Sequence, residues 1–209
     1  MGNPELTPLG HFTYRQYRTW PDSERWELID GIAWSMSAAP TRRHQGITGY
    51  IFSEMHVFLR GKPCRVYISP FNVLLPWAQE EDDDIGTVVE PDIVVFCDRS
   101  KLTDFGARGA PDLVVEVLSP STAKKDLKDK FELYEGRGVR EYWVIDPTAW
   151  SLTVFRLGRE GINSERSRSL AQRYDNGEIR ERLGDRSPIE SRVVPGFVLD
   201  VESAFADLD

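Results

Sequence analysis

The sequence predicts an α/β protein whose mixed central sheet is flanked by helices and extended by extra antiparallel strands. Two runs of Val, Ile and Leu, at 88–96 and 113–118, have the composition of strands covered on both faces. An amphipathic segment and a third hydrophobic run, at 139–146, follow the second run. A strand, helix and strand unit of this length implies a parallel, right-handed crossover. We therefore expect these three runs at the centre of the sheet.

The N-terminal third should supply helices and a hairpin before the central strands. A short helical candidate spans 13–20, and residues 25–36 read as a hairpin with an Asp-Gly turn. The segment 41–59 has apolar residues at helical spacing behind a threonine cap and is expected to be the first long helix. The alternation across 64–76 predicts a strand pair or one bent strand.

Past the central strands, a helix should begin at the Ser-Pro-Ser-Thr segment 119–122 and end at Gly136 or Gly138. Its apolar stripe would consist of Leu127, Phe131 and Tyr134. The remaining chain is expected to contain an edge strand at 151–157, a polar mobile loop at 156–169, an ordered segment at 193–201 and a short helix at 201–208.

Composition favours a single domain over residues 1–209, because a chain with 40% hydrophobic residues can bury a full core. The net charge of -8 and pI near 5.0 disfavour binding of nucleic acid through a uniformly basic surface. Cys64 and Cys97 form no metal-binding pattern, so we expect reduced core thiols in a cytoplasmic protein. Neither a leader segment nor a membrane span is expected.

Two acids in the hydrophobic runs suggest a bound cation. Burying an ionised carboxylate is costly unless a cation or several hydrogen bonds hold it, and Glu116 interrupts an apolar strand. Asp92 stands at the head of the upstream run, and neighbouring strands lie only about 4.8 Å apart. The two carboxylates could therefore share a hard ion, Mg²⁺ or Mn²⁺. From the residues alone, an ion pair between Glu116 and a Lys or Arg explains the strand equally well.

The order of these elements resembles the PD-(D/E)XK nuclease superfamily, and within it a bacterial branch of restriction-endonuclease-like proteins. The resemblance covers roughly Arg25 to Phe155 and implies a restriction-endonuclease-like core at about 25–157, with a C-terminal extension at about 158–209. The motifs that carry it are Glu27-Leu-Ile-Asp-Gly31, His44-Gln45, Pro91-Asp92, Pro111-Asp112-Leu-Val-Val-Glu116-Val-Leu-Ser-Pro-Ser-Thr122, the helix Asp126–Lys130 and Glu141-Tyr-Trp-Val-Ile-Asp146.

The resemblance implies a metal-dependent endonuclease that hydrolyses DNA phosphodiester bonds with Mg²⁺ or Mn²⁺. Asp92 and Glu116 would be the ligands, with the Val117 carbonyl as a third. The superfamily pattern has lysine two positions after the glutamate, where this chain has Leu118, and Lys130 on the next helix is the candidate replacement. A homodimer would suit double-strand cutting.

Three further residues are secondary candidates, each with an ordinary structural interpretation. Glu27 could be a cross-strand partner, and His44 a polar residue at a helix start. Asp112 repeats the Pro-Asp context of Asp92, but lies in the same strand as Glu116. Lys130 itself could form a surface ion pair with Asp126.

Two other functions fit the same residues. Leu118 and the acidic charge are compatible with a catalytically weak or inactive nuclease-fold protein that binds nucleic acid or protein. A metal-dependent hydrolase of small phosphoesters is the third hypothesis.

Overall fold

The computed structural model describes residues 11–21, 23–36, 39–77, 79–119, 126–159, 172–181 and 185–206. Among them, the central sheet has the strand order β12-β11-β10-β9-β6-β3, and β13 also pairs with β11. The strands of this sheet are β3 (Arg65–Ile68), β6 (Ile93–Phe96), β9 (Leu113–Val117), β10 (Glu141–Asp146), β11 (Ser151–Arg159), β12 (Gln172–Tyr174) and β13 (Glu178–Glu181).

The central sheet is mixed, as the sequence predicts. β9 and β10 are parallel, with Leu113 opposite Glu141, whereas β6 and β9 are antiparallel, with Ile93 opposite Val115. All five residues of β9 are buried. The expected strand, helix and strand unit is confirmed.

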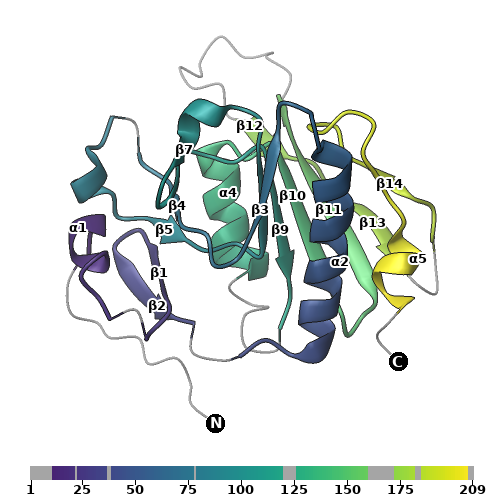
Figure 1. Ribbon diagram of the computed structural model, residues 1–209, viewed down its shortest axis with the longest axis horizontal. Coiled ribbons are helices and arrows are strands. Elements are labelled where there is room, and N and C mark those ends of the chain that lie inside the picture. Colours follow the sequence, from purple (N-terminus) through teal and green to yellow (C-terminus); the bar gives the residue numbers. More distant parts are fainter. Residues whose placement is uncertain are drawn as a thin grey trace.

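Helices cover both faces of this sheet (Figure 1). α2 (Arg42–Leu59) packs through Ile47 and Ile51 in the same apolar cluster as the odd-numbered residues of β9. α4 (Phe131–Arg137) packs through Tyr134 in the cluster that contains Val114. The helix predicted at 41–59 is confirmed, and its Thr41 cap accepts a hydrogen bond from the His44 N–H.

A second sheet holds the N-terminal hairpin beside the central one. Its order is β2-β1-β5-β4-β8-β7, and the predicted hairpin turns at Asp30 and Gly31, both with positive φ. The predicted helix at 13–20 is shorter, α1 (Tyr14–Tyr17). The strands of the second sheet are β1 (Trp26–Ile29), β2 (Ile32–Ser35), β4 (Val73–Leu74), β5 (Val88–Val89), β7 (Leu102–Thr103) and β8 (Gly106–Arg108), and short 3₁₀ turns η1 (Asp82–Asp84) and η2 (Arg99–Lys101) lie between them.

Two predicted strands are each divided between the sheets. The run 88–96 forms β5 and β6, and the segment 64–76 forms β3 and β4, so neither is one strand or a strand pair. Pro91 and Pro70 lie at the two breaks, and proline cannot donate a ladder hydrogen bond. The break at Pro91 leaves Asp92 where the chain passes from one sheet to the other.

Two other expectations need correction. β11 is not an edge strand, because β12 and β13 both pair with it. It runs to Arg159, so residues 156–159 are not loop, and 160–171 lie outside the described residues. The helix after β9 is described only from a π-helical turn, η3 (Asp126–Lys130), and its predicted cap lies largely outside the described residues; it ends at Gly138, with φ of 83°.

The cysteine prediction is wrong, because Cys64 and Cys97 form a disulfide. The register of β3 and β6 places Arg65 opposite Phe96, which makes the two cysteines the next cross-strand pair. The two cysteines are far apart in the sequence, so their proximity in the fold was not predicted. The expectation of a cytoplasmic protein therefore loses the support of reduced thiols.

The C-terminal segment packs against the central sheet through apolar and polar contacts. β14 (Ile189–Glu190), β15 (Val198–Leu199) and α5 (Val201–Ala204) place Phe197 and Phe205 in the α2-side cluster. The helix predicted at 201–208 is confirmed in its first turn. Among the described residues, no helix is both long enough and apolar enough to cross a membrane.

Candidate functional site

Glu116 extends from the middle of the sheet toward α4. Its Oε1 lies 2.8 Å from Lys130 Nζ and accepts a 2.8 Å hydrogen bond from the Tyr134 hydroxyl. Lys130 and Tyr134 are four residues apart, so both side chains project from the same helix face. Glu116 and Lys130 are only 4% and 3% exposed, so their charge-assisted hydrogen bond is largely shielded from solvent.

The N-terminal hairpin contributes a second carboxylate to the same ammonium. Glu27 Oε1 lies 2.9 Å from Lys130 Nζ and accepts a 3.0 Å hydrogen bond from the Glu90 backbone N–H. Glu27 is buried. Lys130 therefore joins β1, β9 and the helix, and the structure brings three of the candidate residues together.

Asp92 occupies the position after the last ladder pair of β6 and β9. Because Ile93 is opposite Val115 in this antiparallel pair, extending the register by one residue puts Asp92 opposite Glu116. Its Oδ2 accepts a 2.8 Å hydrogen bond from the Val117 N–H and lies 3.1 Å from Nε2 of His44, at the start of α2. Asp92 and His44 remain partly exposed, at 18% and 13% of their side chains, so this end of the site is open to solvent.

Comparison with known proteins identifies the family. Residues 14–202 match the model of the Uma2 family, described as "putative restriction endonuclease". The chain belongs to this family. An uncharacterized protein of Synechocystis sp. is 26% identical over 161 residues, 76% of this chain and 77% of that protein. The crystal structure of a "putative nuclease belonging to DUF820" from Anabaena variabilis matches with a TM-score of 0.66 at 18% identity, covering 93% of this chain and 98% of that one. This likeness shows the shared fold.

In this Uma2 protein, Leu118 does not contribute to the polar cluster. It is buried in the α4-side apolar cluster, and its N–H donates to the Ile145 carbonyl. The superfamily lysine position is therefore part of the core here. The Lys130 ammonium contacts Glu116 from the following helix instead.

Asp112 is not brought into the site. It precedes β9 at the opposite end from Glu116, about 13 Å away at 3.3 Å per residue. Its carboxylate accepts a 2.6 Å hydrogen bond from the Cys97 N–H and pairs with Arg140. These contacts fix the chain between β6 and β10, which is a structural role.

Sequence reasoning missed two residues that complete the cluster. Tyr134 was expected only as an apolar core residue, although its position four residues after Lys130 indicates a shared helix face. Burial, followed by the Glu116 carboxylate, raises the pKa of the Tyr134 phenol well above its ordinary value, so the hydroxyl stays a proton donor.

Glu90 is the second such residue. Its backbone N–H contacts Glu27, and its carboxylate accepts hydrogen bonds from Arg25 and from the Tyr17 hydroxyl. It thereby links the site to the hairpin and to α1. Burial and then Glu90 raise the Tyr17 pKa, so this phenol also remains protonated.

The donor set is suitable for a hard divalent ion. Asp92, Glu116 and the Val117 carbonyl supply oxygen atoms, which Mg²⁺ and Mn²⁺ prefer. No cluster of three or more His, Cys, Asp or Glu side chains in metal-binding geometry occurs among the described residues. A pair of carboxylates nevertheless matches Mg²⁺, which commonly binds one or two and retains several waters.

Proposed function

We propose that this Uma2 protein is a metal-dependent endonuclease that hydrolyses DNA phosphodiester bonds. The observation that carries the proposal is the Lys130 ammonium contacting Glu116, the residue that faces Asp92 when the register of β6 and β9 is extended by one pair. Two acids and a lysine are the side chains that the superfamily chemistry requires. The family and the fold support a nuclease, and the choice of DNA as substrate belongs to the proposal.

Asp92 and Glu116 would hold Mg²⁺ or Mn²⁺, with the Val117 carbonyl as a further ligand. When bound, such an ion polarises a phosphoryl oxygen and lowers the pKa of coordinated water. His44 and the Val117 N–H fix the Asp92 carboxylate, while Tyr134 fixes that of Glu116. Lys130 supplies a positive charge that offsets the negative charge developing on the phosphate.

The test compares two charge-removing substitutions around one strand, Glu116→Gln and Asp112→Asn. Purified protein is incubated with plasmid in Mg²⁺ or Mn²⁺, and cleavage is followed on agarose gels. We expect Glu116→Gln to lower the rate at least about 100-fold, because a ligand is lost, and Asp112→Asn to cut within about threefold of the parent. Circular dichroism checks that both variants are folded. Cleavage by Glu116→Gln at the parental rate would eliminate the assignment.

The contacts of Lys130 also favour a second candidate, a nuclease-fold protein with weak or no catalysis that binds nucleic acid or protein. The ammonium touches both Glu116 and Glu27, and this resembles a structural ion-pair network. This candidate predicts metal-independent binding of DNA or RNA without turnover. Activity limited to a panel of phosphate monoesters would instead support a small-phosphoester hydrolase.

Two further features belong to the proposal. Cutting both strands of a duplex at one place suits a homodimer, and light scattering of the purified protein measures its mass. Access to chromosomal or invading DNA requires a cytoplasmic location, which fractionation of cells tests.

A further inference from the structure

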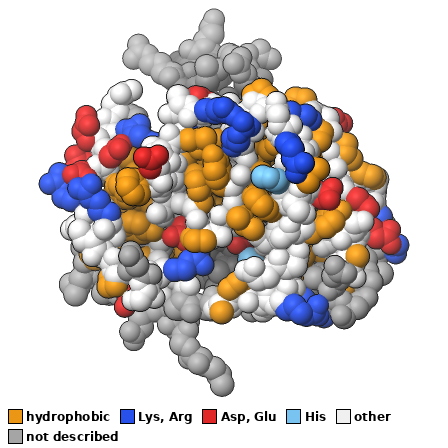
Figure 2. Space-filling model, viewed as in Figure 1, with side chains coloured by type: hydrophobic (Ala, Val, Ile, Leu, Met, Phe, Trp, Pro, Cys, Tyr) orange, Lys and Arg blue, Asp and Glu red, His pale blue; other side chains and the backbone are white. Residues whose placement is uncertain are grey.

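An open cleft of about 560 Å³ lies at the end of β3 and β6 remote from Asp92. Its lining includes three cations, Lys62, Arg65 and Arg99, together with Cys97 of the disulfide. Figure 2 shows Lys and Arg side chains gathered along the upper edge of the face, above the end of α2 and β3 seen in Figure 1. A basic surface is notable in a chain with a net charge of -8.

These three cations are held by neutral groups. Arg65 Nη1 donates to the carbonyl oxygens of Lys62 and Cys64, and Arg99 Nε donates to the Pro63 carbonyl. Lys62 Nζ lies over the Phe58 ring. In the described part of the chain, none of the three pairs with a carboxylate, whereas most other arginines do, for example Arg15, Arg18, Arg108 and Arg140.

One acid lines the cleft. Asp98 accepts hydrogen bonds from the Ser100 N–H and hydroxyl, and these contacts hold its pKa below the ordinary value, so it is ionised. With three cations and this one carboxylate, the lining has a formal charge of +2. The positive charge of Lys62, Arg65 and Arg99 is therefore available to an anionic ligand.

The disulfide fixes the two sides of the cleft to each other. Cys64 adjoins Arg65 on one side, and Cys97 leads to Asp98 and Arg99 on the other. The two backbone segments that carry the cations are thereby joined before any ligand binds, which lowers the entropic cost of binding.

The cleft and Asp92 lie at opposite ends of the β3 and β6 pair. Ser69, whose N–H donates to the Asp92 carbonyl, is five residues from Cys64, or about 17 Å at 3.3 Å per residue. DNA rises about 3.4 Å per base pair, so this distance corresponds to about five base pairs. A phosphate in the cleft and one at Asp92 could belong to the same duplex, but not to a small phosphoester.

We propose that this cleft binds a backbone phosphate of nucleic acid several nucleotides from the bond that is cut. The inference rests on the proposed function for the identity of the substrate. It adds a second, remote contact that would make the protein prefer long nucleic acids over small phosphoesters.

The test measures binding of a fluorescein-labelled 20-base-pair duplex by anisotropy, in EDTA and again in Ca²⁺, across a series of salt concentrations. The variants are Lys62→Ala, Arg65→Ala, Arg99→Ala and their combination. The matched controls are Arg15→Ala and Arg18→Ala, which remove exposed arginines that already contact Asp83.

Each phosphate contact contributes about 0.9 to the slope of log affinity against log salt, so the combined variant, which loses the one phosphate contact of the cleft, should lose about 1 from this slope. The controls should keep the parental slope. In cleavage of the same duplex, the combined variant should raise KM about tenfold or more and leave kcat unchanged. Equal slopes for parent and combined variant, or no binding by the parent in either condition, would overturn the proposal.

The two proposals fail in different ways. If Glu116→Gln abolishes cleavage while the combined variant binds like the parent, only the cleft assignment fails. If cleavage does not depend on Glu116 but the salt slopes differ, the nuclease assignment fails and the cleft remains a nucleic-acid contact.

Discussion

At the residue scale, the Lys130 ammonium is compatible with both interpretations of Glu116 that the sequence left open, a metal ligand and a partner in an ion pair. Lys130 forms the ion pair that the structural interpretation requires, and it is also the lysine that the nuclease interpretation requires. Both are compatible because a carboxylate has two oxygens and several acceptor sites. Family resemblance named Lys130 as a candidate beside Glu116, but the contact between them was not predicted, since fourteen residues separate the two in the sequence.

Tyr134 should stabilise the protein through its hydrogen bond to Glu116. Tyr134→Phe removes the donor and leaves a buried carboxylate with one partner fewer, so we expect a loss of about 2 kcal/mol in the free energy of unfolding. Urea denaturation measures it. Tyr67→Phe is the control, because no hydrogen bond from the Tyr67 hydroxyl is found among the described residues, and it should cost less than about 0.5 kcal/mol. Equal losses would contradict the role of the Tyr134 hydroxyl.

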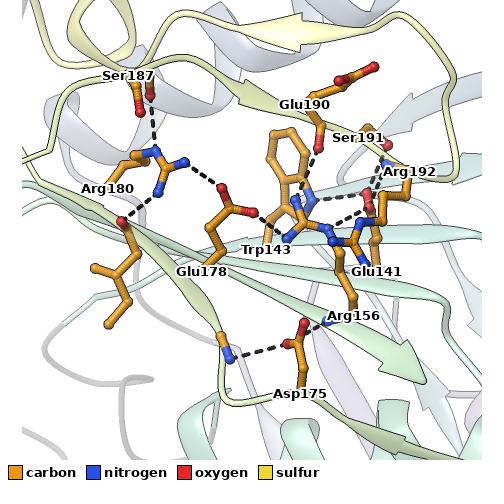
Figure 3. A network of polar contacts seen from close by, with 12 residues as sticks. Glu141, Trp143, Arg156, Asp175, Glu178, Arg180, Ser187, Glu190, Ser191 and Arg192 are labelled. Atoms are coloured by element: carbon orange, nitrogen blue, oxygen red, sulfur yellow. Dashed lines mark hydrogen bonds and ion pairs between the residues drawn. The ribbon is translucent and has the colours of Figure 1, made fainter. Parts of the chain in front are cut away.

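At the element scale, a buried polar network joins the C-terminal strands to β10 and β11 (Figure 3). Glu141 accepts hydrogen bonds from Arg156, from the Ser191 hydroxyl at 2.7 Å and from the Arg192 N–H at 2.6 Å. Arg156 also reaches Glu178 on β13 and the Glu190 carbonyl on β14. In the sequence, Glu141 was only the first residue of a motif that carries the resemblance, whereas Arg156, Ser191 and Arg192 lie 15 to 51 residues later.

Arg156→Ala should destabilise the protein strongly, because it leaves Glu141 buried without its cation. The expected loss is about 3 to 5 kcal/mol, and chemical denaturation measures it. Arg15→Ala, which removes an exposed ion pair with Asp83, should change stability by less than about 1 kcal/mol. A small loss for Arg156→Ala would indicate that solvent reaches Glu141 and that the network does not anchor the C-terminal segment.

At the scale of the whole molecule, three buried or partly buried phenols make the fold sensitive to alkali. Burial is the first cause that raises the pKa of Tyr17, Tyr134 and Tyr174 above the ordinary value of 10.0. As the pH rises past about 10, the unfolded chain releases these protons while the folded protein retains them. The stability they contribute is therefore complete below that pH and declines above it.

Melting temperatures between pH 8 and pH 11 test this linkage. We expect a steep decline above about pH 10, with each tyrosine contributing up to about 1.4 kcal/mol per pH unit. Tyr174→Phe, at a phenol that donates to the Val139 carbonyl, should make the decline shallower. An unchanged pH profile in this variant would show that Tyr174 does not carry the effect.

The packing of the C-terminal segment is relevant to the predicted single domain. Residues 185–206 contribute Phe197, Leu199 and Phe205 to the cluster that includes β9 and α2. The extension therefore shares the core that supports the candidate site. The single-domain prediction for residues 1–209 stays a prediction, and one cooperative melting transition would support it.

The sequence by itself determined the local elements and the chemistry of the acids. The hydrophobic runs at 113–118 and 139–146 predicted the central strands β9 and β10, the threonine cap predicted the start of α2, and the Asp-Gly pair predicted the hairpin turn. These features depend on the conformational preferences of residues close together in the sequence, which local sequence patterns indicate. The acids in the hydrophobic runs already marked Asp92 and Glu116 as candidates for a cation site, and family resemblance added Lys130.

Only the tertiary structure decided which distant groups meet. In the structure, residues 88–96 are divided between two sheets, and Cys64 is bonded to Cys97. Glu27 lies beside Lys130, whereas Asp112 contacts the Cys97 N–H and not the site. The physical reason is that strand order and register bring together residues tens of positions apart, and no local propensity encodes that choice.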